Sequence, residues 1–214
     1  MSVEKGLEFL ERYLISNGYI IFLKTPDTFT FRARNSNIWE IVDFVLTRYE
    51  IEYDESSRKP KVVLGTLEQD LARWDFTINA MAQDDSGNLI DLFGGQADLV
   101  NRILKTPLEP NITFLDDPLR LFRPIRFTIT KNLTMDPSLW VAFKNHLIYQ
   151  KLWTVVSSER IREELTKMFA FNTSASLKLL FEFGKKIESV YSTFLSDLFE
   201  KTGIWLKPTT EKIK

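Results

Sequence analysis

The spacing of apolar residues changes along this chain, and the change limits the folds that it can adopt. Residues 28–34 alternate apolar and polar side chains, with the two-residue period of a β-strand. From Asp116 onward, apolar residues instead recur at helical intervals. We therefore predict an α+β protein with a small mixed or antiparallel sheet before about residue 115 and an all-helical part over residues 116–214.

Shorter signals place individual elements. Residues 3–14 carry leucines at helical spacing, and residues 39–48 form a second β-rich run that we expect to pair antiparallel with residues 28–34. Thr66 and Gln69 have the spacing of a capping box, in which each side chain bonds the other residue's amide at a helix start. Further helices are predicted after the Ser157-Ser158 cap and over residues 174–183, with Gly184 ending the latter.

Composition excludes several classes of function. The 214 residues include no cysteine and one histidine, so disulfides, thiolate nucleophiles and Cys- or His-based metal sites are excluded. No apolar run approaches the length of a membrane span, and the N-terminus lacks the pattern of a secretory signal. We expect no membrane role and a cytoplasmic or other intracellular location. The net charge of −1 requires any RNA contact to come from local clusters of Lys and Arg.

One cluster combines an acid with three arginines. Asp117 is followed at three-residue steps by Arg120, Arg123 and Arg126, which on a helix would share one broad face. Guanidinium forks suit phosphates or the acceptor edge of a base, and the carboxylate can accept from an exocyclic amine. The alternative is an ordinary solvated, salt-bridged helix face.

Three other stretches contain candidate residues. Polar residues punctuate the apolar run at positions 73–79 and must satisfy each other or a ligand. Gly94 and Gly95 precede a predicted helix, where a glycine pair can cradle phosphate or simply form a tight turn. Asp43 is a carboxylate within a β-forming run, a position that suits either an edge partner or a catalytic acid.

Taken in order, these stretches resemble the class II CCA-adding tRNA nucleotidyltransferases and the related bacterial poly(A) polymerases. The resemblance runs from Asp43 to about Gly184, and the segments that carry it are LEQDLARWDFTINAMA, GNLIDLFGG with ADL, TFLDDPLRLFRPIRF and SSERIREELTKM. It implies a nucleotidyltransferase of the polymerase β superfamily, with a head domain over residues 1–115 and a helical neck over residues 116–214. CMP and AMP would pass from CTP and ATP to an RNA 3′-hydroxyl, with the tRNA 3′ end as the expected partner.

The resemblance also implies roles for individual residues. Those matching the neck residues that read ATP and CTP are Asp117, Arg120, Arg123 and Arg126. Those in the element for ribose and triphosphate recognition are Arg73, Asp75 and Asn79. Those in the flexible element near the junction of head and neck are Asp91, Gly94, Gly95 and Asp98. Asp43 matches the third catalytic carboxylate.

Three departures from the family pattern affect these roles. No GGxVRD run or D-x-D pair precedes Asp43, so the site for two Mg²⁺ ions is incomplete, because one carboxylate cannot hold both ions. Trp74 stands where the family usually has an arginine, so a phosphate contact is lost or replaced by stacking. Pro124 lies within the arginine-bearing helix, where an interior proline predicts a kink.

We therefore expect the nucleotide-selecting part of a tRNA 3′-end nucleotidyltransferase, with the missing carboxylates on a separate polypeptide or an upstream segment. Two alternatives stay open, a non-catalytic nucleotide- or RNA-binding relative and a poly(A)-adding enzyme. RNA contact is expected in the helical part, at Arg160, Arg162, Lys167, Lys178, Lys185 and Lys186.

Overall fold

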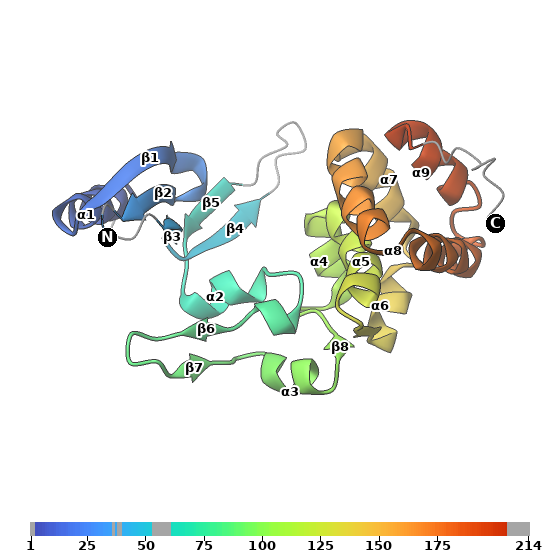
Figure 1. The fold of residues 1–214 in the computed structure, drawn as a ribbon, viewed down its shortest axis with the longest axis horizontal. Coiled ribbons are helices and arrows are strands. Elements are labelled where there is room, and N and C mark those ends of the chain that lie inside the picture. Colours follow the sequence, from blue (N-terminus) through green and yellow to red (C-terminus); the bar gives the residue numbers. More distant parts are fainter. Residues whose placement is uncertain (1–2, 36, 38–39, 53–60, 205–214) are drawn as a thin grey trace, which may run out of the picture. The chain divides into compact units, whose positions relative to one another are not determined.

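The computed structural model describes residues 3–35, 37, 40–52 and 61–204. The chain forms two compact units, Met1–Arg73 and Trp74–Lys214. The first contains the larger sheet and the second contains most of the helices, which confirms the predicted α+β class (Figure 1). The division between head and neck at residues 115/116 falls in the last turn of a helix within the second unit, and it stays a prediction.

The first unit begins with helix α1 (Val3–Ser16), which packs on a three-stranded antiparallel sheet. The strands are β1 (Tyr19–Thr25), β2 (Thr30–Asn35) and β3 (Ile41–Val45), in that order. The predicted N-terminal helix and the antiparallel pairing of the two β-rich runs are both confirmed. Strand β1 was not predicted, because the YIIFL stretch that forms it is apolar throughout and shows no alternation.

The rest of this unit is a hairpin and a short helix. Strands β4 (Arg48–Glu52) and β5 (Lys61–Leu64) pair antiparallel, and α2 (Leu67–Ala72) follows. The predicted capping box is confirmed, since the Thr66 hydroxyl accepts from the Gln69 amide and the Gln69 side chain accepts from the Thr66 amide.

The second unit begins with short elements. A 3₁₀ turn, η2 (Thr77–Asn79), precedes the antiparallel strands β6 (Ala82–Gln83) and β7 (Leu89–Ile90). Helix α3 (Gly95–Val100) then leads to β8 (Ile103–Leu104), which pairs parallel with β9 (Thr134–Met135).

The helices of this unit other than α3, together with the turn η3, share one core rich in aromatic side chains, in which Phe76, Phe114, Phe143 and Phe183 are all almost fully buried. Burial of so much apolar surface is the main favourable term that holds the helices together. They are α4 (Pro110–Asp116), η3 (Pro118–Leu121), α5 (Phe122–Thr130), α6 (Pro137–Ala142), α7 (His146–Val155), α8 (Ser158–Ile187) and α9 (Phe194–Thr202). No helix of the described residues is long and apolar enough to cross a membrane.

The helical run predicted from Asp116 is not continuous in the structure. Asp116 ends α4, and the 3₁₀ turn η3 and helix α5 follow as separate elements. Pro124 is the third residue of α5, and α5 has regular helical geometry throughout, so the predicted kink is wrong. The proline is accommodated because the amides of the first helical turn have no partner within the helix.

The helix start predicted at Ser157-Ser158 is confirmed in position, because Ser157 is the N-cap residue of α8, but its hydroxyl makes no capping hydrogen bond. The helix end predicted at Gly184 is wrong. Helix α8 does not end at Gly184 but continues to Ile187. It is interrupted only at Asn172, whose backbone is not helical. Gly184 instead permits close packing, since a Cβ placed there would lie 2.8 Å from Cδ1 of Leu195.

Candidate nucleotide-selecting site

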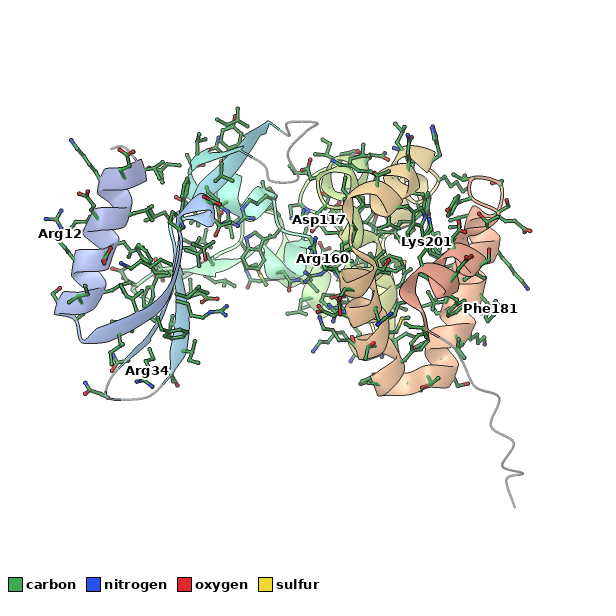
Figure 2. All side chains as sticks on the ribbon, turned by 90° about the horizontal axis from the view of Figure 1, so that it is seen from above. Arg12, Arg34, Asp117, Arg160, Phe181 and Lys201 are labelled. Atoms are coloured by element: carbon green, nitrogen blue, oxygen red, sulfur yellow. The ribbon has the colours of Figure 1, made fainter. Side chains whose placement is uncertain are left out.

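Asp117 precedes the 3₁₀ turn η3 with an extended backbone. Its Oδ1 accepts a hydrogen bond of 3.2 Å from the Leu119 amide and so caps the turn. Its Oδ2 lies 3.6 Å from Nη2 of Arg160 in α8, and the two residues are adjacent in Figure 2. At 36% side-chain exposure, the carboxylate keeps access to solvent. One oxygen therefore fixes the orientation of Asp117, and the other can accept from a ligand.

Arg120 lies one 3₁₀ turn beyond Asp117, and its amide donates to the Asp117 carbonyl over 3.0 Å. Residues three apart lie on the same side of a 3₁₀ turn, so the arginine and the acid share one side. The Arg120 side chain is partly exposed, and it makes no hydrogen bond or ion pair to any residue that the structure describes. Its five N–H donors are therefore available to a ligand.

Arg123 contacts Asp75, with 2.7 Å between Nε and Oδ2. This distance defines an ion pair, but neither atom makes a hydrogen bond, so we infer that the Nε–H is not directed at the oxygen. Asp75 is 4% exposed and its Oδ1 accepts from the Asn79 side-chain amide over 3.0 Å. Asn79 thus satisfies one oxygen of Asp75, while the Arg123 side chain keeps 36% of its surface exposed.

Arg126 is held in a more buried ion pair. Its Nε lies 2.6 Å from Oε2 of Glu164 in α8, and the two side chains are only 15% and 9% exposed. Lys167 donates to the other carboxylate oxygen over 3.1 Å. Burial alone raises the pKa of Glu164, but hydrogen bonds and charge from Arg126 and Lys167 outweigh it, so the pKa lies below its ordinary value. Arg126 thus joins α5 to α8 and does not extend the row begun by Arg120.

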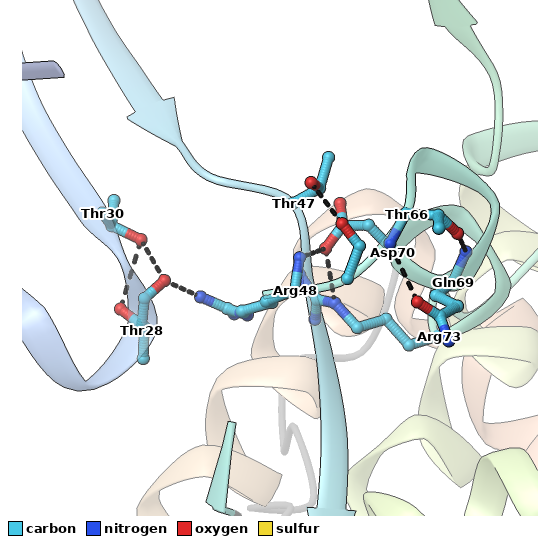
Figure 3. A network of polar contacts seen from close by, with 9 residues as sticks. Thr28, Thr30, Thr47, Arg48, Thr66, Gln69, Asp70 and Arg73 are labelled. Atoms are coloured by element: carbon cyan, nitrogen blue, oxygen red, sulfur yellow. Dashed lines mark hydrogen bonds and ion pairs between the residues drawn. The ribbon is translucent and has the colours of Figure 1, made fainter. Parts of the chain in front are cut away.

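The residues at positions 73–79 fall into two units. Arg73 belongs to the first unit, where its Nε donates to Oδ1 of Asp70 over 2.9 Å (Figure 3). The same oxygen accepts from the Arg48 amide over 3.3 Å, which ties α2 to β4. Trp74 begins the second unit and exposes 43% of its surface, so its ring is open to a stacking partner.

The stretch predicted to form the flexible element contains several local hydrogen bonds. Asp91 accepts from the amides of Gly95 and Gln96 over 2.7 and 3.0 Å, and these bonds hold its pKa below the usual range. Gly94 has a φ of 76°, which favours glycine, and Asp98 accepts from the Thr77 hydroxyl over 2.6 Å. A Cβ on Gly95 would lie 2.2 Å from the Thr77 carbonyl oxygen. The two glycines serve a tight turn and close packing in this structure, rather than an open phosphate cradle.

Asp43 lies on β3 in the first unit and is bound by an arginine that the sequence reading did not single out. Arg32 on β2 donates from Nε and Nη2 to the two carboxylate oxygens over 2.6 and 2.7 Å. The hydrogen bonds from Arg32 lower the pKa of the Asp43 carboxyl. Across residues 3–35, 37, 40–52 and 61–204, no three acidic or histidine side chains are grouped so that they could hold a metal ion. The described residues therefore do not fit a two-ion magnesium site.

The predicted RNA-contacting residues have mixed surroundings. Arg162 donates to the Thr202 carbonyl over 2.6 Å, and Lys186 lies 4.1 Å from the centre of the Trp140 ring. Lys178 and Lys185 are exposed on α8. These cations lie on one long helix, but some of them have structural partners.

Comparison with known proteins identifies relatives of this chain. The poly(A) polymerase head domain matches residues 14–105. The chain is 38% identical over 143 residues to tRNA nucleotidyltransferase cca2 of Schizosaccharomyces pombe, covering 65% of this chain and 29% of the relative. It is 35% identical over 192 residues to the CCA-adding enzyme of Geobacillus thermodenitrificans, covering 87% of this chain and 45% of the relative. The chain thus spans less than half the length of these relatives.

Solved structures with the same fold include two that contain ligands. The Thermotoga maritima CCA-adding enzyme complexed with tRNA is 25% identical, with a TM-score of 0.62, and the match covers 85% of this chain and 40% of that one. A CCA-adding enzyme in complex with CTP is 26% identical, with a TM-score of 0.64, over 83% of this chain and 39% of that one. On these likenesses and its fold, the chain belongs to the family of class II CCA-adding tRNA nucleotidyltransferases and poly(A) polymerase head domains.

Proposed function

We propose that this chain is the nucleotide-selecting part of an RNA 3′-end nucleotidyltransferase and that Asp117 and Arg120 read the base. The observation that carries the proposal is the guanidinium of Arg120, which lies one 3₁₀ turn from the carboxylate of Asp117, whose side chain is 36% exposed. Arg123 and Arg126 are engaged by acids, whereas Arg120 has no partner among the described residues.

The side chains of Asp117 and Arg120 together suit cytosine and adenine for a chemical reason. Each of these bases carries an exocyclic amine, which donates, next to a ring nitrogen, which accepts. A carboxylate beside a guanidinium offers the complementary order of acceptor and donor. Uracil and guanine present a carbonyl next to a ring N–H, so both hydrogen bonds would be mismatched. An unmatched buried donor or acceptor costs more than a lost hydrogen bond, so the pair can discriminate.

Support for the substrates comes from the relatives. One solved relative holds CTP and another holds tRNA, so CTP and a tRNA 3′ end are substrates that we propose. ATP is the further substrate that we propose, because adenine presents the same order of donor and acceptor as cytosine. The described residues do not supply the carboxylates for two Mg²⁺ ions. Transfer is therefore proposed only for an assembly in which a separate polypeptide or another segment supplies them.

The proposal is tested by nucleotide binding to the Arg120→Ala variant. Equilibrium dialysis with labelled CTP should show binding to the wild-type chain and a loss of about tenfold or more in affinity, equal to about 1.4 kcal/mol, in the variant. Arg12→Ala is the matched control, because Arg12 is an exposed arginine on α1 whose acidic partner lies 3.9 Å away. Equal affinities in Arg120→Ala and Arg12→Ala would contradict the proposal.

A second candidate is a nucleotide- or RNA-binding protein without transferase activity. The Arg32–Asp43 pair favours it, since the aspartate that matches a catalytic carboxylate is bound by an arginine. Incubation with Mg²⁺, labelled CTP and ATP, and tRNA lacking its terminal nucleotides separates the two candidates. Labelled tRNA with the chain alone would rule out the second candidate, and CTP binding without labelling would support it.

A further inference from the structure

Arg32 and Asp43 are directly opposite each other in the sheet. The register of β2 and β3 pairs these two residues, and both carboxylate oxygens accept from the same guanidinium. Such a two-bond fork fixes distance and orientation together, and it is the strongest geometry available to an Arg–Asp pair. The two side chains are 46% and 43% exposed, so the pair lies at the surface of the first unit.

The pair lies on the face of the sheet that α1 does not cover. On the covered face, Phe31 and Ala33 are buried, and Lys24 pairs with Glu11 of α1. Because side chains alternate along a strand, Arg32 and its cross-strand partners project to the opposite face. By the same register this open face carries Arg34 and the exposed apolar residues Ile20, Leu23, Ile41 and Val45. Asp43 therefore lies among apolar and cationic side chains.

We infer that Asp43 serves as the acidic half of a cross-strand ion pair, in which Arg32 rather than a divalent cation compensates its charge. The donor set supports this inference. Mg²⁺ and Ca²⁺ require several oxygen ligands, and a single carboxylate is a weak site without others beside it. The paired residues that share this face with Asp43 include no second carboxylate. Arg32, in contrast, is held at contact distance by the strand pairing itself, so no separate ion has to be captured.

At Asp43 this chain departs from the pattern of its family. Asp43 corresponds to a catalytic carboxylate in the resemblance, yet its surroundings here favour a structural partner. It does not depend on the nucleotide site proposed at Asp117 and Arg120. The two proposals can fail separately, because one is measured by metal binding and carboxylate titration and the other by nucleotide affinity.

The first measurement is the binding of Mn²⁺ to the chain, which is monitored by electron paramagnetic resonance. We expect the wild-type chain to show no saturable site at millimolar Mn²⁺, and Asp43→Asn to give the same binding curve. Saturable binding that is present in the wild-type chain and absent in Asp43→Asn would overturn the inference. Circular dichroism of both proteins establishes that the substitution leaves the fold intact.

The second measurement is the pKa of the Asp43 carboxyl group. NMR gives it from the chemical shift of the carboxyl carbon as pH is varied, in the wild-type chain and in Arg32→Gln. Arg34 is the other ionisable residue that the register places on this face, and it is unchanged in both proteins. We expect the pKa to lie below the ordinary value of 3.8 in the wild-type chain and to rise when Arg32 is replaced. Arg12→Gln, which removes an equal charge from α1, should leave it unchanged. An Asp43 pKa that does not change in Arg32→Gln would contradict the inference that Arg32 compensates the charge of Asp43.

Discussion

The guanidinium of Arg126 lies 2.6 Å from the carboxylate of Glu164, and this contact joins α5 to α8 across 38 residues of sequence. Both side chains are mostly buried, so each compensates the charge of the other where water cannot. α5 directly follows the turn that carries Arg120. The pair therefore stabilises the helix that supports the candidate site.

Replacing Glu164 with alanine should destabilise the second unit strongly. The change leaves a buried guanidinium without its partner, which costs about 3 kcal/mol. Urea unfolding, followed by circular dichroism, measures the effect. Glu163→Ala is the control, because Glu163 is exposed on the same helix. Similar unfolding midpoints for the two variants would show that the ion pair contributes little.

The same pair should make stability depend on pH in the acid range. The pKa of Glu164 is lower in the folded chain than its ordinary value of 4.5. Its contribution to stability is therefore fully present above pH 4.5 and is lost as pH falls through the lower folded-state pKa. The difference in unfolding free energy between wild type and Glu164→Gln should shrink over that window. A difference that stays constant as the pH falls through it would contradict this assignment.

Asp117→Asn separates capping from base reading. Asparagine retains an oxygen that can cap the turn, so stability should change little. The Oδ2 position, which also lies 3.6 Å from Nη2 of Arg160, can become an N–H donor that would face the donor amine of cytosine or adenine, so affinity for CTP and ATP should fall about tenfold. Calorimetry measures both properties. Asp85→Asn, in an exposed turn, is the control, and equal nucleotide affinity in the two variants would remove Asp117 from the site.

Gly95→Ala tests the close packing of α3 on η2. An added Cβ would lie 2.2 Å from the Thr77 carbonyl oxygen, so backbone must move, and we expect a loss of about 1–3 kcal/mol. Gly94→Ala has open space around it but must keep a φ of 76°, so it should cost about 1 kcal/mol. Thermal unfolding gives both values. The packing would be looser than described if Gly95→Ala were the milder of the two.

The sequence predicted those parts of the fold that depend on local patterns. The helix at Val3–Ser16, the capping box at Thr66 and the antiparallel pairing of β2 with β3 each follow from residue spacing. Gly184 was misread because its requirement is a contact with Leu195, which local pattern does not show. Pro124 was misread because the helix that contains it begins only two residues earlier.

The sequence indicated the acid and arginines of the candidate site but not their partners. Asp75 and Arg123 are 48 positions apart in sequence, and Arg126 and Glu164 are 38 apart, so periodicity cannot pair them. Glu164 could have been suspected, because it is an acid on the apolar side of a predicted helix and needs a buried cation. Alternation along residues 28–34 places Arg32 on one face, but only the strand register brings it to Asp43.

The central claim is that Asp117 and Arg120 distinguish bases by their donor and acceptor order. Calorimetric titration of the chain with each of the four ribonucleoside triphosphates, in buffer without divalent cations, tests it most directly. We predict that CTP and ATP bind at least about tenfold more tightly than UTP and GTP, and that Arg120→Ala abolishes this difference. Equal affinity for all four nucleotides in the wild-type chain would contradict the claim.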